Sequence, residues 1–148
     1  MASKTIAIAC DHGGFDLKNT LINELKSKGL EVLDLGCDSA DSVDYPDYAY
    51  KLAQAIKDGQ AERGVVVCGS GIGISIAANR FPEIRCALVH DAIGAKLSRQ
   101  HNNANVIAFG DRTTGVATAI DALNIFLDTE FEGGRHARRV EKLSNPPL

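Results

Sequence analysis

Five short apolar runs, separated by helical patterns, constrain the fold of this chain more than any other feature. Between the runs, apolar residues recur every three or four positions, as Leu17, Leu21 and Leu25 do. Such alternation is typical of a parallel sheet covered by helices on both faces. The sequence therefore predicts an α/β protein: a three-layer α/β/α sandwich with a five-stranded, parallel, Rossmann-like sheet. The expected strands are residues 5–10, 31–35, 64–68, 85–90 and 105–109, and the expected helices are residues 15–28, 46–58, 74–80, 92–101 and 114–127, with a last short helix starting near His136.

The length and charge of the chain fit one globular domain over residues 1–148. A formal net charge of −3 gives no support to a nucleic-acid surface. No apolar run approaches the length of a membrane span, so no membrane partner is expected. The apolar run at the N-terminus is too short for a signal peptide and is interpreted as a strand, which favours the cytoplasm.

The four cysteines are spaced too far apart for a C-x-x-C pair, which argues against a zinc ribbon or a thioredoxin-type motif. We expect all of them to be thiols in a reducing compartment. Cys86 lies inside an apolar run and is expected to be a buried small hydrophobe. Cys37 lies in a polar loop and carries little information.

Residues 65–75, VVVCGSGIGIS, are the segment best suited to chemistry. Cys68 ends a buried strand, a glycine-rich loop follows, and a helix begins after it. Ligands of open parallel sheets bind at this edge, and exposed backbone N–H groups there can hold a phosphate or an oxyanion. The simpler alternatives are a tight turn for the glycines and a buried core thiol for Cys68.

Polar residues follow each of the other strands, and we expect them to meet Cys68 at the same edge of the sheet. They are Asp11 and His12, Asp44 and Tyr45, His90 and Asp91, and Asp111 and Arg112. Asp91 is expected to cap the following helix rather than to act as a catalytic acid. His12 could instead be a neighbour of a helix cap, and Tyr45 could simply pack.

Two further groups of polar residues lie elsewhere in the sequence. His101 and Asn102 end the fourth helix, away from the carboxyl edge of the sheet. Arg135 and Arg139 are four residues apart and share a helix face. Paired guanidinium groups suit a phosphate dianion, although a solvated helix face is the alternative.

A dinucleotide-binding loop is the obvious rival interpretation of the glycines. They read G-x-G-x-G, with Ile74 where the third glycine of the fingerprint should fall, and Asp91 lies where a ribose-binding acid would be expected. A P-loop is excluded, because no G-K-[ST] follows. The four histidines do not pair at helical spacing, so no metal site is predicted.

Five segments spread over nearly the whole chain give a more specific indication. The chain resembles the ribose-5-phosphate isomerase B family, in the group that includes galactose-6-phosphate and allose-6-phosphate isomerases. The resemblance implies an aldose–ketose isomerase with an α/β/α fold and no metal or organic cofactor. It also implies a homodimer, or a dimer of dimers, whose active sites lie at the subunit interface. The matching segments are CDHGGF (10–15), DYPDYA (44–49), CGSGIGISIAANR (68–80), LSRQHNNANVIAFG (97–110) and GGRHARRV (133–140).

The resemblance also implies roles for individual residues. Cys68 matches the general base, and a family branch with a glutamate at the position of Ile74 does not fit this chain. His101 matches the group that helps to open the sugar ring, and Asn102 a substrate contact from the partner chain. The resemblance implies an oxyanion hole formed by the Ser70 hydroxyl and by the amides of Gly69, Ser70, Gly71, Ile72 and Gly73. It places Asp11, His12 and Tyr45 at the sugar, and it makes Ser70 and Asp11 catalytic residues. The implied phosphate ligands are His12, Arg135 and Arg139, with Arg112 as an addition.

The resulting hypothesis is an enzyme of the pentose phosphate pathway that interconverts ribose 5-phosphate and ribulose 5-phosphate through a cis-enediolate. Because enediolate formation places charge on an oxygen, oriented backbone donors beside Cys68 fit this chemistry. Two alternatives stay open: a six-carbon sugar phosphate as substrate, and a nucleotide-binding module without catalysis.

Overall fold

The computed structural model describes residues 4–147, so the first three residues and Leu148 of the expected domain lie outside the described part. A five-stranded sheet in the order β2-β1-β3-β5-β4, parallel throughout, forms its centre. The strands are β1 (Thr5–Cys10), β2 (Glu31–Asp34), β3 (Arg63–Cys68), β4 (Cys86–Leu88) and β5 (Val106–Gly110). The helices are η1 (His12–Gly14), α1 (Phe15–Ser27), α2 (Tyr45–Lys57), α3 (Ile72–Ala78), α4 (Ala92–Gln100), α5 (Val116–Asp128) and α6 (Arg135–Ser144).

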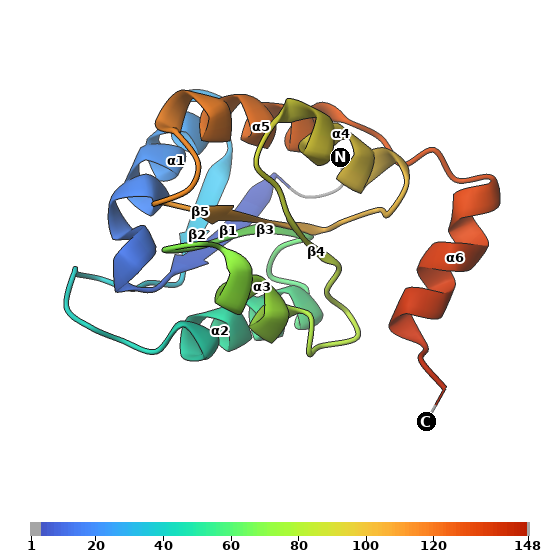
Figure 1. Ribbon diagram of the computed structural model, residues 1–148, viewed down its shortest axis with the longest axis horizontal. Helices are drawn as coiled ribbons and strands as arrows, with labels where there is room; N and C mark the ends of the chain where they lie inside the picture. Colours follow the sequence, from blue (N-terminus) through green and yellow to red (C-terminus); the bar gives the residue numbers. More distant parts are fainter. Residues whose placement is uncertain (1–3, 148) are drawn as a thin grey trace.

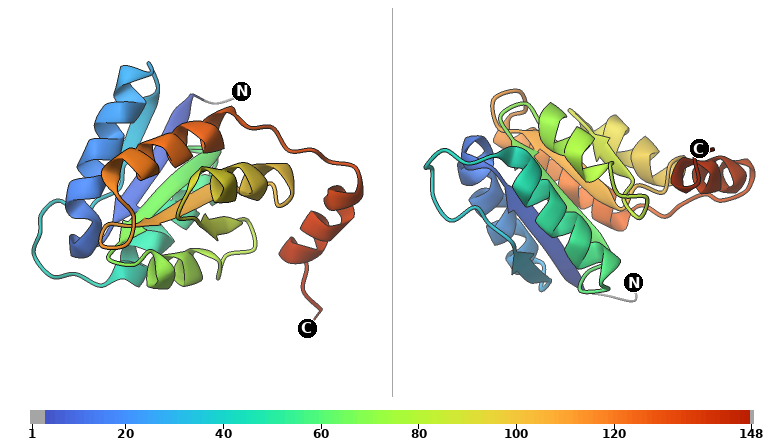
Figure 2. Two further views of the ribbon diagram at one scale, coloured as in Figure 1. Left: turned by 45° about the horizontal axis from the view of Figure 1, so that its top comes forward. Right: turned by 90° about the horizontal axis from the view of Figure 1, so that it is seen from below.

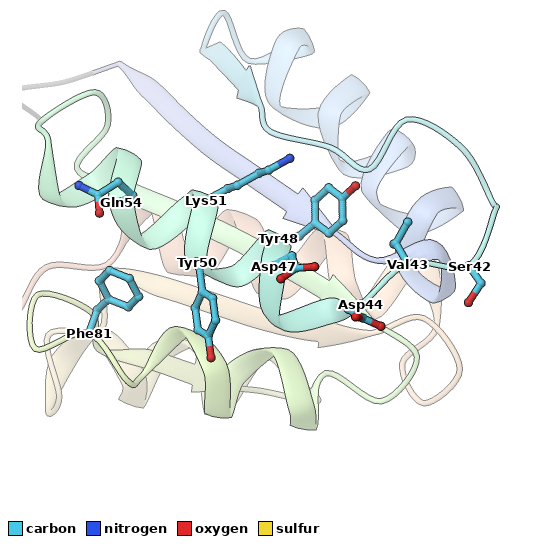
Figure 3. Close-up of a pocket in the computed structure, with 9 residues that line it drawn as sticks. All are labelled: Ser42, Val43, Asp44, Asp47, Tyr48, Tyr50, Lys51, Gln54 and Phe81. Carbon is cyan, nitrogen blue, oxygen red and sulfur yellow. The ribbon is translucent and has the colours of Figure 1, made fainter.

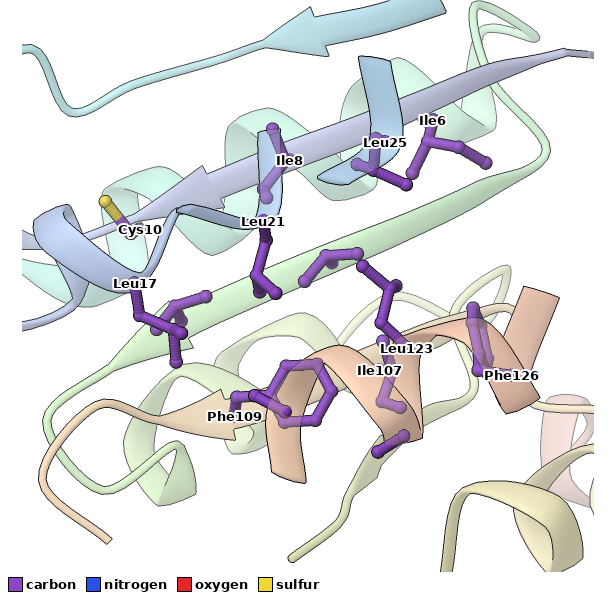
Figure 4. Packing of buried hydrophobic residues seen from close by; sticks show 14 of the residues in the cluster. Ile6, Ile8, Cys10, Leu17, Leu21, Leu25, Ile107, Phe109, Leu123 and Phe126 are labelled. Carbon is purple, nitrogen blue, oxygen red and sulfur yellow. The ribbon is translucent and has the colours of Figure 1, made fainter. Parts of the chain in front are cut away.

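Helices cover both faces of the sheet, which confirms the predicted three-layer α/β fold. α1, α4 and α5 lie on one face, and α2 and α3 lie on the other (Figure 1). Along β3 the pleat turns Val65 and Val67 to the first face and Val66 to the second, and each face has its own apolar core. Figure 4 shows the first core, in which α1 and α5 pack on β1 and β5.

Several element bounds differ from the sequence-based expectation. The strand expected over residues 85–90 is limited to Cys86–Leu88, because β4 is an edge strand that pairs only with β5. The helix expected from Ile74 begins earlier, at Ile72, because Gly71 adopts φ 76° and turns the chain directly into α3. The glycine loop is therefore shorter than expected.

A buried cation fixes the chain after β2. Lys18 of α1 is 1% exposed, and its Nζ donates to Asp34 Oδ1 at 2.8 Å and to the Cys37 carbonyl at 2.9 Å. Burial of an ammonium group is tolerated when charge and hydrogen bonds compensate it. Lys18 thus holds the start of the loop that leads to α2.

α6 stands apart from the rest of the molecule in all three views (Figures 1 and 2). Among its side chains, those of His136 and Val140 are buried. The segment after α5 carries α6 away from the sheet. No helix within residues 4–147 is long and apolar enough to span a membrane.

Candidate active site

A hollow of about 700 Å³ lies at the carboxyl ends of β1, β3 and β5, and we call it the Cys68 hollow. Its position confirms that polar residues after different strands meet at this edge. Five residues that were expected at this edge are not in its lining: His12, Asp44, His90, Asp91 and Asp111. The lining residues are Asp11, Tyr45, Cys68, Gly69, Ser70, Ile72, Gly73, Arg112 and Thr113.

Cys68 is at the last position of β3, and its side chain is 5% exposed. The Gly71 N–H donates to Cys68 Sγ at 3.1 Å. A backbone donor directed at sulfur stabilises negative charge there. Burial raises the pKa of Cys10 to about 12, and burial also raises the pKa of Cys86. These two cysteines are therefore kept as protonated, unreactive thiols.

The glycine loop has little room for side chains. A Cβ on Gly71 would lie 2.8 Å from the Phe109 backbone. A Cβ on Gly73 would lie 2.6 Å from the Tyr45 ring, so the phenol rests directly on the loop. The Ile72 N–H donates to Ser70 Oγ at 3.2 Å. Of the five amides expected to bind an oxyanion, those of Gly71 and Ile72 are therefore already engaged within the loop.

The two residues after β1 have different places. Asp11 lines the hollow, and its Oδ1 accepts the Gly13 N–H at 2.9 Å, which caps η1. His12 lies outside the lining, and its Nδ1 accepts the Val43 N–H at 3.1 Å. His12 therefore fastens the loop before α2 to the rim of the site.

Arg112 provides a cation in the lining of the Cys68 hollow. The neighbouring Asp111 has a structural contact instead, because its Oδ2 accepts the Leu17 N–H at 3.2 Å. Asp91 caps α4 as expected, through the Gly94 N–H at 2.8 Å. Thr113, which sequence reasoning missed, joins the lining because the turn after β5 folds back on Gly110.

A second, separate hollow of about 280 Å³ contains His101, Asn102, His136 and Arg139. His101 follows α4, and β5 begins five residues later, so this hollow lies toward the amino ends of the strands. Cys68 lies at their carboxyl ends. Within one chain, the structure does not bring together Cys68 and His101.

Buried Arg99 holds the turn that carries His101 and Asn102. Its Nη1 donates to the Ala104 carbonyl at 2.8 Å and to Asn103 Oδ1 at 2.9 Å. Asn103 itself has φ 48°, a conformation that asparagine tolerates better than most residues. The turn is thus fixed by side-chain contacts.

His101 belongs to a cluster with Glu132 and His136, which we call the His101 cluster. The His101 and His136 rings stack with centroids 4.4 Å apart and planes 15° apart. Sequence reasoning missed Glu132 and the role of His136, although Glu132 and His136 have i,i+4 spacing. The sequence signal that could have revealed this cluster was the helical spacing of a glutamate and a histidine, whereas only pairs of histidines were considered.

The residues of the His101 cluster are of metal-binding types, and within positions 4–147 their candidate ligand atoms lie within 4.8 Å of one another. An imidazole lone pair lies in the plane of its ring. Because the two rings are nearly parallel and stacked, their lone pairs do not converge on one point. The cluster is therefore not arranged as a metal site.

A larger, open hollow of about 850 Å³ lies along α2 (Figure 3). Asp44 and Asp47 contribute carboxylates to it, and Lys51 contributes a cation that contacts the Tyr48 ring at 4.7 Å. Paired carboxylates disfavour an anionic ligand, and the hollow contains no thiol or histidine. The Cys68 hollow is the better candidate for catalysis.

The chain resembles known proteins over nearly its whole length. The profile of the family described as Ribose/Galactose Isomerase matches residues 6–143. Ribose-5-phosphate isomerase B of Escherichia coli is 45% identical over 141 residues, which cover 95% of each chain. D-erythrulose-4-phosphate isomerase of Pectobacterium atrosepticum is 47% identical over 140 residues, which cover 94% of this chain and 92% of the relative.

Solved structures agree with these sequence relatives. Ribose-5-phosphate isomerase B of Clostridium thermocellum superposes with a TM-score of 0.93 at 48% identity, covering 95% of both chains. The type B enzyme of Trypanosoma brucei superposes with a TM-score of 0.93 at 42% identity, covering 98% of this chain and 99% of the other. The chain therefore belongs to the ribose/galactose isomerase family and is, as its motifs predicted, an aldose–ketose isomerase of sugar phosphates.

Proposed function

We propose that the protein interconverts ribose 5-phosphate and ribulose 5-phosphate, with Cys68 as the general base. The observation that carries this proposal is the Cys68 Sγ, which accepts a backbone N–H at 3.1 Å inside a hollow lined by polar side chains. A sulfur placed in this way can remove a proton beside a carbonyl. The relatives named ribose-5-phosphate isomerase B support the five-carbon substrate.

In the forward direction the Cys68 thiolate takes the proton from C2 of the open-chain aldose. The C–H electron pair forms the C1–C2 double bond, and O1 becomes negatively charged. The O2 hydroxyl proton passes to O1, and the thiol returns its proton to C1, which yields the ketose and restores the thiolate. Ser70 and Asp11 line the hollow and are the side chains assigned to the transfer between oxygens.

The negative charge of the cis-enediolate needs donors that are already oriented. Because the Gly71 and Ile72 amides have partners within the loop, we assign this role to the amides of Gly69, Ser70 and Gly73. This narrows the oxyanion hole from five amides to three. Tyr45 rests on Gly73 and forms the wall against which the sugar lies.

A second copy of the chain would complete this site. The groups expected to open the ring and to bind substrate, His101 and Asn102, lie in a different hollow of the same chain, together with Arg139. The exposed apolar side chains of Ile72, Ile76 and Ile93 support a subunit contact, since they are 53%, 54% and 57% exposed. We therefore propose a homodimer with each site at the interface.

Arginines from both chains, together with the His12 imidazole, would then surround the phosphate. Arg112 lines the Cys68 hollow and His12 lies at its rim, while Arg135 and Arg139 come from α6 of the second copy. Binding the phosphate away from the reacting carbons positions the sugar for proton transfer. The proposed reaction needs no metal or organic cofactor and belongs to the pentose phosphate pathway.

The substrate assay tests this proposal directly. kcat/KM is measured for ribose 5-phosphate, allose 6-phosphate, galactose 6-phosphate and D-erythrulose 4-phosphate, with Cys68→Ala as the control for each. We expect the highest value for ribose 5-phosphate. A large preference for a six-carbon or four-carbon substrate would replace the proposed substrate but keep the reaction. The nucleotide alternative lacks its ribose-binding acid, because Asp91 caps α4.

A further inference from the structure

His136 is placed to hold the His101 imidazole in one orientation. The two rings stack with centroids 4.4 Å apart and planes 15° apart. The His136 residue is 8% exposed, whereas the His101 side chain is 39% exposed. A buried ring against one face of an exposed ring restricts its rotation, which lowers the entropic cost of using it as an acid or base.

Glu132 adds a charge beside both rings. Its Oε1 lies 3.5 Å from His136 Nε2 and 3.9 Å from His101 Nε2. The Glu132 N–H donates to the Gln100 carbonyl at 3.1 Å, so its backbone is fixed to the end of α4, next to His101. This backbone contact keeps Glu132 next to the turn that carries His101.

The His101 cluster is also where α6 contacts the rest of the chain. α6 stands apart from the sandwich (Figure 2), and its buried side chains are His136 and Val140. Arg139, one helical turn after His136, lines the same hollow as His101. The ring stack thus fixes the distance between His101 and the arginines of α6.

We infer that His136, supported by Glu132, is a positioning residue that holds His101 in place for opening the sugar ring and ties it to the phosphate-binding arginines of α6. The inference rests on the proposed function, in which His101 opens the ring. It adds two residues, Glu132 and His136, to which that function assigned no role.

The electrostatics around His136 agree with this geometry. Loss of hydration lowers the pKa of His136, and the neighbouring His101, Arg135 and Arg139 lower it further, while Glu132 opposes them. A neutral His136 can stack on a charged His101 without the repulsion between two imidazolium ions.

Two His136 variants separate positioning from loss of fold. His136→Ala removes the stack, and His136→Phe keeps an aromatic ring in its place. We expect kcat for ribose 5-phosphate to fall about tenfold or more in His136→Ala. In His136→Phe we expect it to stay within about threefold of wild type. Glu141→Gln, an exposed charge change on the same helix, is the control and should leave kcat unchanged. Equal losses in the Ala and Phe variants would overturn the inference.

A second readout isolates the ring-opening step. Ribulose 5-phosphate is acyclic, so deuterium exchange from solvent into its C1 position needs the Cys68 step but no ring opening. At saturating substrate, His136→Ala should isomerise ribose 5-phosphate about tenfold or more slowly but keep exchange into ribulose 5-phosphate within about threefold of wild type. Parallel loss of both would contradict a role in ring opening. A wild-type protein that neither isomerises nor exchanges would instead overturn the proposed function.

A titration tests the contact itself. The pKa of His136, followed by NMR of its ring protons, should rise in His101→Phe, because the charge of His101 is one cause of its low value. The same pKa should fall in Glu132→Gln, because the carboxylate opposes those causes. Unchanged titration in both variants would show that the three groups do not face each other in solution.

Discussion

The Cys68 hollow and the His101 cluster are built in different ways. In the hollow, strand ends and backbone amides place the sulfur, and the adjoining loop is packed too tightly for added side chains. In the cluster, side chains position His101. Its ring stacks on His136 of α6, a helix that stands apart from the sheet (Figure 1), and the Glu132 carboxylate lies beside both rings. Under the proposed function, one chain supplies the groups for proton transfer, whereas ring opening and part of the phosphate binding would depend on a second copy.

The largest expected effect is at Cys68. Cys68→Ala removes the proposed base and should lower kcat by about a thousandfold or more, because general base catalysis contributes about 10² to 10⁴. Circular dichroism and thermal unfolding should stay close to wild type. Near-normal turnover in this variant would show that the base lies elsewhere.

The next effect tests whether the loop of the Cys68 hollow is rigid. Gly71→Ala forces a side chain onto a residue with φ +76° and puts its Cβ 2.8 Å from backbone. We expect a loss of about 3 kcal/mol in the free energy of unfolding, measured with urea. Gly59→Ala is the matched control, since Gly59 has φ +81° but nothing within 4 Å of its Cβ. It should cost about 1 kcal/mol, and equal losses would mean that the loop is not tightly packed.

A smaller effect is expected on the α6 side. Arg139→Gln removes a guanidinium from the hollow that holds His101, and KM should rise about tenfold while the unfolding temperature stays unchanged. Arg138→Gln, on the same helix but outside that hollow, is the control and should leave KM unaltered. If both variants behave alike, α6 acts through its overall charge and not through one phosphate contact.

The smallest effect concerns the buried thiols of the sandwich. Burial raises the pKa of Cys10 from the ordinary 9.0 to about 12, so the folded state keeps this thiol protonated where the unfolded chain ionises. Its contribution to stability is full below about pH 9 and is lost as the pH rises toward 12. The urea midpoint should therefore fall between pH 8.5 and about 10.5, and Cys10→Ala should fall less steeply. A wild-type midpoint independent of pH in that range would contradict the burial argument.

Local patterns were sufficient to predict most of the fold. The three leucines of α1 have helical spacing and pack into one core, and the apolar run before Cys68 forms the central strand. The end of the edge strand could not be predicted, because no local sequence pattern shows that β4 pairs on one side only and ends at Leu88. The expectations of a cytoplasmic location and of one domain over residues 1–148 stay predictions.

The candidate site was predictable where it follows strand ends. Asp11, Cys68 and Arg112 meet because parallel strands end at the same edge. Glu132 and His136 escaped notice because their partner, His101, is about 30 residues away and the contact depends on how the segment before α6 runs. A contact between residues so far apart in the sequence can be found only in a three-dimensional structure.

Subunit complementation tests the central claim most directly. Cys68→Ala and His101→Asn proteins are each assayed alone, then unfolded together, refolded as a mixture and assayed. If each site takes Cys68 from one chain and His101 from the other, half of the dimers are mixed and each has one intact site, so activity should recover to about a quarter of wild type. Activity no higher than the mean of the two separate variants would contradict a site shared between two chains.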